Sequence, residues 1–269
     1  MPPPPTTPPT LFNRCNLSPW VIGDLSFQDR PQPLEIAGVR QADRRLFTRL
    51  AALADPEERG QVFHDYVSVK FRLHEWAEHQ NAARTSIRSS YLQFLRNWGI
   101  ESNGYAGAVL KSWVESRFGL LPTFHGGRLS ADEAARNRYE FDCMRGASKT
   151  VGATMQLDLL YTFCQDELLR RFPGQRWRTL YRGTHDPEEY ALHHADVSSP
   201  QSACVQLNNL SSFSADPEIA WEFGSSVWEV QVPLQKIVFF SGLLPRNLLG
   251  GESEYLVLGG DYRVRSLRC

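Results

Sequence analysis

Two glutamates near the C-terminus are the residues most suggestive of chemistry. The stretch GGESEYLVLGG, residues 250–260, places Glu252 and Glu254 one residue apart at the head of an apolar run. The run EYLVL lies between glycines and is rich in aliphatic and aromatic residues, which is typical of a short strand. Because side chains alternate on a strand, both carboxylates are expected on one face, about 7 Å apart. Such a pair either lies at a solvated strand end without a role or supplies two acids for catalysis.

Two further polar patterns precede the glutamates. The segment TLYRGT puts Arg182 near the end of a predicted strand, where a guanidinium can offer two parallel hydrogen bonds to a phosphate or carboxylate. Gly183 beside it would let a planar ligand approach the backbone. The segment LSSFSADPEIAWEFG places Ser212 and Ser214 on one side of a strand end, before a short helix. Each pattern alone is also compatible with a solvated strand end or an ordinary helix cap.

The elements that must position these residues change type along the chain. Apolar residues recur at helical spacing in the first half, and long helices are predicted over residues 61–80, 85–99, 102–119 and 153–172. Residues 121–140 are predicted as a surface connection with a short helix. After Gly174 the period changes to two, and strands are predicted over residues 176–183, 226–234, 236–244, 254–260 and 261–267. A short helix over 216–224 interrupts them. Helices followed by strands predict an α+β fold.

Composition narrows the class of protein. The 269 residues are 42% apolar and 22% charged with a formal net charge of −1, which is ordinary for a globular protein and does not indicate a nucleic-acid or membrane binder. The five scattered cysteines contain no CxxC pair, which favours a reducing, cytoplasmic location and argues against a structural zinc site. No apolar run approaches the ~18 residues of a membrane span. Residues 1–10, MPPPPTTPPT, are predicted to be a disordered proline-rich tail rather than a signal peptide.

The three polar patterns taken together resemble a known signature. An arginine, then Ser-x-Ser before DPEIAWEF, then Glu-x-Glu is the order found in arginine-modifying mono-ADP-ribosyltransferases of the Arg-Ser-Glu type. The helical half, with segments such as VKFRLHEWAE, SYLQFLRNWGI and GAVLKSWVESRFGL, is similar to one family of that class, the bacterial dinitrogenase reductase ADP-ribosyltransferases. This resemblance covers nearly everything beyond the proline tail. It implies a single domain over 11–269, with a mainly helical part, 11–174, wrapped onto a β core, 175–269, of two packed sheets with NAD in the cleft between them.

The same resemblance implies a reaction and roles. NAD would be a substrate, and its ADP-ribose would pass to an arginine of dinitrogenase reductase, the iron protein of nitrogenase, which is thereby switched off. Arg182 would hold the NAD phosphates, Gly183 would pair with the nicotinamide amide, and Ser212 would orient the catalytic glutamate. Glu254 would bind the ribose and stabilise the developing cation. Glu252 would face the incoming arginine and help to remove its proton.

Other residues and partners are less sharply defined. Phe223 is equally compatible with stacking on nicotinamide and with a place in the core, whereas Ser214 is expected to support the strand end. His185, His193 and His194 match no common spacing of metal ligands, and the family's chemistry needs no metal. A PII signalling protein is a further implied partner. The alternatives are an NAD glycohydrolase, a transferase acting on another protein arginine, and a catalytically silent binding module.

Overall fold

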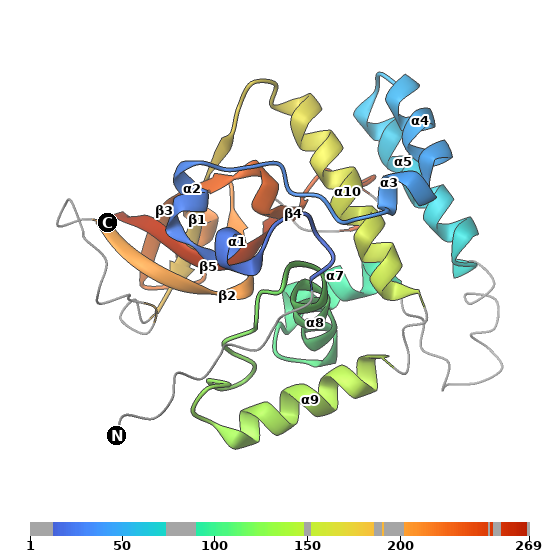
Figure 1. Ribbon diagram of the computed structural model, residues 1–269. Helices are drawn as coiled ribbons and strands as arrows, with labels where there is room; N and C mark the ends of the chain where they lie inside the picture. The colour runs from blue at the N-terminus through green and yellow to red at the C-terminus, as the bar shows by residue number, and fades with distance from the viewer. Residues whose placement is uncertain are drawn as a thin grey trace.

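The fold is that of an α+β protein, as the order of patterns in the sequence predicts. A computed structural model describes residues 13–73, 90–147, 152–185, 190, 202–246, 248–249 and 254–267. Helices fill the first part of the chain and strands the second (Figure 1). The first helices are α1 (Pro19–Gly23), α2 (Leu25–Asp29), α3 (Val39–Ala42), α4 (Arg44–Ala52) and α5 (Pro56–Lys70). They are followed by α7 (Tyr91–Ile100), α8 (Tyr105–Phe118), α9 (Glu133–Ala147) and α10 (Ala153–Arg171).

The strands form a closed antiparallel arrangement. They are β1 (Trp177–Thr184), β2 (Ser202–Ser214), β3 (Ser226–Pro233), β4 (Ile237–Phe240) and β5 (Glu254–Leu267), with α11 (Pro217–Trp221) and a 3-10 turn, η3 (Leu234–Lys236), between them. Strands β2 and β3 each pair with both β1 and β5, so four strands close a ring, and β4 extends from β5. One hydrogen-bonded sheet therefore contains all five described strands, and the expected division into two packed sheets is not confirmed.

Strand β5 differs from the sequence prediction of two strands broken at Gly259–Gly260. It runs without interruption from Glu254 to Leu267. The glycines are needed for close approach: a Cβ on Gly259 would lie 1.8 Å from the Asn208 carbonyl oxygen, and Gly260 has φ +105° beside the backbone of Gly23. Glycine allows both features, and here it lets a long strand pass its neighbours without ending.

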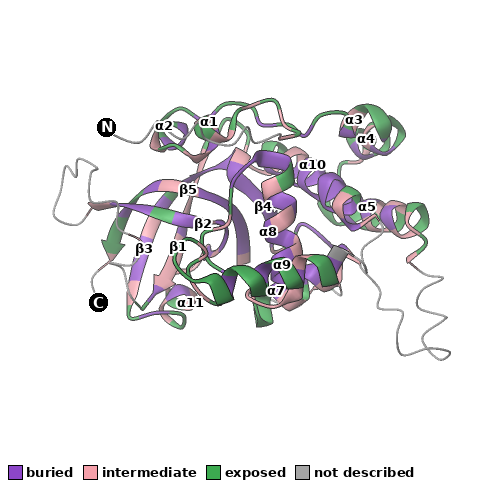
Figure 2. Cartoon of the chain, turned by 60° about the horizontal axis from the view of Figure 1, so that its bottom comes forward, coloured by how far each residue is buried: buried purple, intermediate pink, exposed green. Residues whose placement is uncertain are grey.

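Helices of the first half pack directly against the sheet. Helix α10 lies on β4, α8 on β2, and α1 and α2 on β5, an arrangement that Figures 1 and 2 show from two sides. Residues 156–164 of α10 are all buried, as expected for a helix between layers. One continuous cluster of buried apolar side chains includes residues of both halves. The domain boundaries drawn from the sequence stay a prediction.

The helix limits agree with the prediction at one position and differ at another. Helix α8 ends where predicted, at Gly119, which adopts φ +70°. Helix α7 begins after Ser90, whose side chain accepts a hydrogen bond from the Leu92 amide; the predicted start at Thr85 lies outside the described residues. The prediction of only a short helix within 121–140 is wrong, because α9 has 15 residues. Its side chains Ala135, Tyr139 and Asp142 recur at helical spacing and are buried.

Candidate active site

The strand register brings the three polar patterns to one place. In the pairing of β2 with β5, Ser214 lies opposite Glu254 and Ser212 lies opposite Leu256. In the pairing of β1 with β2, Tyr181 lies opposite Ser214. The end of β1, the end of β2 and the start of β5 therefore meet. This juxtaposition could not be read from the sequence, because some 70 residues separate the first pattern from the last.

Hydrogen bonds connect Arg182, Ser212 and Glu254. A guanidinium nitrogen of Arg182 (Nη1) donates to the Ser212 carbonyl oxygen at 2.8 Å. The Ser212 hydroxyl donates to Oε1 of Glu254 at 3.4 Å. This second distance is longer than the ~2.7 Å typical of a hydroxyl donor, but catalytic hydrogen bonds are often long before a substrate binds. Burial raises the pKa of Glu254, and the Ser212 hydrogen bond opposes this rise. The structure thus brings together three of the residues singled out in the sequence.

One residue of the constellation was not found from the sequence. The indole nitrogen of Trp98, on α7, donates to the Ser212 hydroxyl oxygen at 2.8 Å. The next residue, Gly99, lies so near the carboxylate that a Cβ there would be 3.9 Å from Oε2 of Glu254. Trp98 falls in the helix predicted over residues 85–99, and it lies on the buried face of α7. Nothing in the pattern indicated which strand this face would meet.

Gly183 is a glycine for a reason that differs from the sequence interpretation. A Cβ at this position would lie 2.1 Å from the Ala220 carbonyl oxygen of α11. Gly224 is equally constrained, because its Cβ would meet the Thr184 amide nitrogen at 2.2 Å. Two glycines therefore allow the chain around α11 to cross β1 at backbone contact. Pairing of the Gly183 backbone with a ligand stays a prediction.

The end of α11 exposes an aromatic ring beside this crossing. Phe223 is 66% exposed, so the interpretation of this residue as core is wrong. Trp221 on the same helix is partly buried. Ser214 is buried, and its hydroxyl accepts a hydrogen bond from the Asp216 amide at 2.9 Å, so it supports the strand end as expected. Asp216 in turn caps α11 through the Glu218 amide.

The second acidic residue of the motif, Glu252, lies outside the described residues. Hydrogen bonds hold the described parts of the connection from β4 to β5. Arg96 on α7 donates to the Leu248 carbonyl oxygen from two guanidinium nitrogens, at 3.2 and 2.5 Å. The backbone groups of Ser241 and Glu254 are joined by a hydrogen bond of 2.8 Å. The helical half therefore contacts both the strands of the candidate site and the segment that leads to Glu252.

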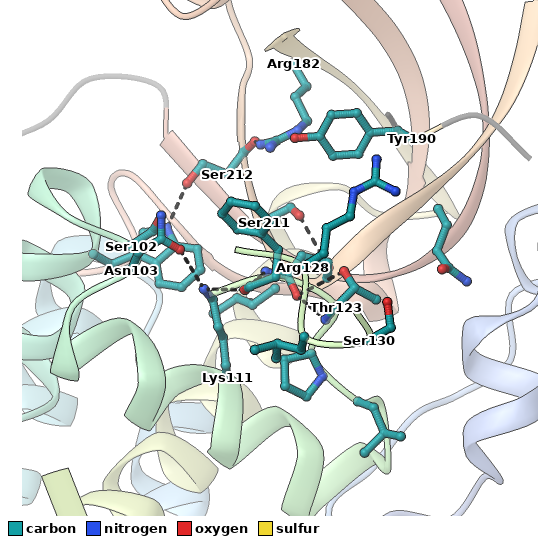
Figure 3. A pocket seen from close by; sticks show the side chains of 18 residues that line it. Ser102, Asn103, Lys111, Thr123, Arg128, Ser130, Arg182, Tyr190, Ser211 and Ser212 are labelled. Carbon is teal, nitrogen blue, oxygen red and sulfur yellow. Dashed lines mark hydrogen bonds between the residues drawn. The ribbon is translucent and has the colours of Figure 1, made fainter. Parts of the chain in front are cut away.

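A large pocket adjoins the constellation. Its volume is about 790 Å³, within the range of ligand pockets. Trp98, Arg182 and Ser212 line one part of it, and Figure 3 shows Arg182, Tyr190 and Ser212 together above Lys111. Three cationic side chains, Lys111, Arg128 and Arg182, contribute to the lining. Among the described residues, the buried Nε of Arg182 has no hydrogen-bond partner. A donor left unpaired in this way suits an anionic ligand.

A bulge in β2 builds the pocket wall. The register with β5 shifts between Leu207 and Leu210, where two asparagines turn toward the helical half. The Asn208 side chain binds the segment before α9, accepting from the Thr123 amide and donating to the Phe124 carbonyl oxygen, both at 2.9 Å. Asn209, which is buried, donates to two further backbone carbonyls of the helical half. Nothing in the sequence pattern indicated this wall, since only the end of β2 was predicted as strand.

The floor of the pocket holds a buried basic group. Lys111 is 1% exposed and donates to the Phe124 carbonyl oxygen at 2.9 Å and to Oδ1 of Asn103 at 3.2 Å. Its ammonium also lies 3.3 Å from Nδ1 of His125, whose other ring nitrogen lies 3.2 Å from a carboxylate oxygen of Asp142. Burial lowers the pKa of Lys111 to about 8 and also lowers the pKa of His125. The amine therefore keeps most of its charge at neutral pH.

Within the described ranges, no group of three or more His, Cys, Asp or Glu side chains is placed to hold a metal ion. His193 and His194 lie outside these ranges. None of the helices in the described part of the chain is long and apolar enough to cross a membrane.

The fold and the site together fit a class of protein. An arginine with a spare donor, a serine hydrogen-bonded to a half-buried glutamate, and an adjoining pocket with cationic walls are what the Arg-Ser-Glu class of ADP-ribosyltransferases requires in space. The sequence resemblance implied roles for these residues, and the structure adds the hydrogen bonds by which the three residues meet.

Comparison with known proteins identifies the family. Residues 12–266 match the family described as dinitrogenase reductase ADP-ribosyltransferase, and the chain belongs to that family. A relative from Rhodospirillum rubrum, NAD(+)–dinitrogen-reductase ADP-D-ribosyltransferase, is 41% identical over 260 residues, which cover 94% of each chain. No solved structure matches.

Proposed function

We propose that this protein transfers ADP-ribose from NAD to an arginine of dinitrogenase reductase. The name of the Rhodospirillum rubrum relative describes this donor and this acceptor, and the family is the same. The single observation that supports the proposal most is the meeting of Arg182, Ser212 and Glu254 beside a pocket with cationic walls. The reaction needs an anion holder and a fixed negative charge next to one ligand, and these residues provide both.

On the donor side, the bond between nicotinamide and ribose breaks and nicotinamide leaves with the electron pair. Arg182 holds the phosphates of NAD, because its guanidinium has a buried nitrogen without a partner. Glu254 binds the ribose and stabilises the positive charge that develops there. Its partly buried position strengthens this attraction, since less water screens the charge. Ser212 keeps the carboxylate in place.

The nicotinamide end is proposed to lie near the crossing of β1 and α11. There the backbone of Gly183 pairs with the carboxamide, and the exposed ring of Phe223 stacks on nicotinamide. The exposure of Phe223 supports this proposal, because an aromatic side chain left 66% in water has contact area to offer a ligand.

On the acceptor side, the new bond joins a guanidinium nitrogen of the target arginine to the ribose carbon. Arginine is protonated in water, so a proton must leave around this step. We assign the removal of this proton to Glu252, whose carboxylate pairs with the incoming guanidinium and then accepts the proton. Glu254 then serves the donor and Glu252 the acceptor.

The consequence of the reaction is inactivation of the target. ADP-ribose is bulky and anionic, and on a docking surface it blocks a partner by its size and charge. Nitrogen fixation is regulated in this way, and we place the reaction in the cytoplasm. A PII signalling protein as a further partner, and a division of the strand ring into two packed sheets of the ADP-ribosyltransferase type, stay predictions from the resemblance.

The alternatives are an NAD glycohydrolase and a transferase for another protein arginine. Glu252→Gln distinguishes a glycohydrolase from a transferase, because a transferase with this change should lose arginine modification and keep slow release of nicotinamide. Wild-type protein that hydrolyses NAD equally fast with and without an acceptor would show that hydrolysis is the native reaction.

The direct test uses NAD labelled in its adenosine part. The protein is incubated with this NAD and purified dinitrogenase reductase, and label on an arginine of the reductase is sought by mass spectrometry. We expect one modified arginine and loss of the reductase's activity. In a parallel incubation with a cell extract, label on a different protein together with none on the purified reductase would retain the transferase activity and overturn the proposed substrate.

A further inference from the structure

Helix α7 supplies a residue to the catalytic constellation that is not part of the Arg-Ser-Glu signature. Trp98 is buried, at 5% exposure, and its indole nitrogen lies 2.8 Å from the Ser212 hydroxyl oxygen. The same hydroxyl lies 3.4 Å from Oε1 of Glu254. Indole nitrogen, hydroxyl and carboxylate thus form one chain that runs from the helical half to the strand core.

The hydrogen-bonding capacities of the three groups fix the direction of this chain. An indole N–H can only donate, an ionised carboxylate can only accept, and a serine hydroxyl has one proton. Ser212 must therefore accept from Trp98, which leaves its single proton for Glu254. We propose that Trp98 is a positioning residue, which holds the Ser212 hydroxyl in the one orientation that donates to the catalytic carboxylate. This assignment rests on the proposed function of Glu254.

The surroundings of the indole support this role. The Tyr91, Phe94 and Leu95 side chains on the same face of α7 are buried, so the ring has little freedom to turn. The Lys111 ammonium lies 5.8 Å from the ring centroid of Trp98. A cation near the ring face attracts its electrons and makes the N–H a stronger donor.

A double-mutant cycle tests the assignment. Trp98→Phe removes the N–H and keeps an aromatic ring. Because the Glu254 carboxylate is then less firmly oriented, we expect kcat to fall about tenfold for both NAD cleavage and transfer. The KM for NAD should change little. In the Ser212→Ala background the same change should cost no further activity, because the hydroxyl through which Trp98 acts is absent. An equal loss in both backgrounds would overturn the proposal.

The pH profile supplies a readout that simple loss of packing would not move. The Ser212 hydrogen bond favours the charged carboxylate, so a free-turning hydroxyl raises the pKa of Glu254. The acid limb of kcat should therefore shift to higher pH in Trp98→Phe. The charged side chains of the neighbouring elements are retained in the variant, among them Arg182 on β1, Lys111 on α8 and Arg96 on α7. An unchanged acid limb argues against the role.

A control and an isosteric variant exclude a folding defect. Trp113→Phe removes another buried indole donor, which donates to Oδ1 of Asp158 at 2.8 Å and does not contact Ser212 or Glu254. In this control variant the acid limb of kcat should lie at the same pH as in the wild type. Benzothienylalanine at position 98 keeps the indole shape and lacks only the N–H. Its activity should match that of Trp98→Phe, and full wild-type activity would overturn the proposal.

A measurement without turnover separates this inference from the proposed function. In the NMR spectrum of protein labelled with 15N-tryptophan, the Trp98 indole proton should resonate downfield of an indole proton without a protein acceptor. It should also exchange slowly with solvent. Ser212→Ala should shift it upfield and speed its exchange. If the wild type cleaves no NAD, the proposed function fails, while this measurement still decides whether Trp98 holds the serine. An indole signal that ignores Ser212→Ala overturns the inference alone.

Discussion

At the scale of single residues, the state of Glu254 is set by two opposing effects. Burial disfavours its charge and raises its pKa, and the Ser212 hydrogen bond partly restores the charge. The carboxylate therefore needs a higher pH than a free glutamate, whose pKa is ~4.3, to be ionised. A charge kept in a partly dry site is more effective against a developing cation than the same charge in water.

Replacement of Glu254 should remove the chemistry and spare the fold. We expect Glu254→Gln to lower both NAD cleavage and arginine modification on the order of 100- to 1,000-fold, because a preorganised charge is lost. The melting temperature should stay the same or rise, since a neutral amide is easier to bury. Nicotinamide release and calorimetry measure the two effects. A variant that still modifies arginine at the wild-type rate would mean that another group carries the reaction.

At the scale of elements, helix α7 joins three parts of the site. Trp98 binds Ser212, Gly99 lies beside Glu254, and Arg96 donates to the Leu248 carbonyl oxygen ahead of Glu252. The side chains at 96 and 98 project from different sides of the helix, one exposed and one buried. A single helix can therefore act on the donor and acceptor sides separately.

Loss of Arg96 should affect the acceptor side alone. The exposed guanidinium holds the segment before Glu252 by two hydrogen bonds to one carbonyl. We expect Arg96→Ala to lower arginine modification about tenfold and to leave NAD cleavage in the absence of acceptor unchanged. Arg49→Ala, at an exposed position on α4, is the matched control. Equal losses in the two assays would show that Arg96 supports the whole site rather than the acceptor segment.

At the scale of the whole molecule, the N-terminal helix α2 bridges two strands of the ring, β3 and β5. The buried Gln28 side chain donates to the Gln231 carbonyl oxygen on β3 and the Arg263 carbonyl oxygen on β5, and it accepts from the Arg263 amide. Nearby, the fully buried Lys236 donates to the Gly259 carbonyl oxygen at 3.1 Å, and its ammonium lies 4.4 Å from the Tyr262 ring centroid. A segment far from the strands in sequence is thus part of the core.

The buried lysine should make stability depend on pH. Burial lowers the pKa of Lys236 to about 7 in the folded state, whereas the unfolded chain has the ordinary value of ~10.4. Between these values the unfolded state binds more protons, so this residue's contribution to the free energy of unfolding rises with pH. The destabilisation is complete below pH ~7 and is relieved as pH rises toward ~10.

Lys236→Met isolates this effect, because methionine fills similar space without a charge. We expect the variant to gain stability relative to wild type near pH 7 and to lose this advantage by up to ~1.4 kcal/mol per pH unit as the pH rises. Urea unfolding of both proteins at several pH values between 7 and 9.5 measures the difference. Other titrating groups cancel in the comparison. A difference that does not vary with pH would show that the lysine stays charged in the folded protein.

The sequence by itself determined the class of fold and pointed to most residues of the candidate site. Apolar spacing predicted helices where α7, α8 and α10 lie, and turn chemistry predicted the end of α8 at Gly119 and a short helix at the position of α11. These features are local, since neighbours within one or two turns decide them. The order of arginine, serines and glutamates could likewise be recognised without coordinates.

Only the tertiary structure decided what these residues touch. Trp98 meets Ser212, the β2 bulge carries the pocket wall, and Gly183 admits the backbone of α11, because distant segments pack there. The continuity of β5 through Gly259 has the same origin, since the local sequence pattern does not indicate that the Asn208 backbone packs against this glycine. Helices, strands and turns follow from short-range interactions along the chain, whereas the contact partners of a side chain follow from how the whole chain buries its apolar surface.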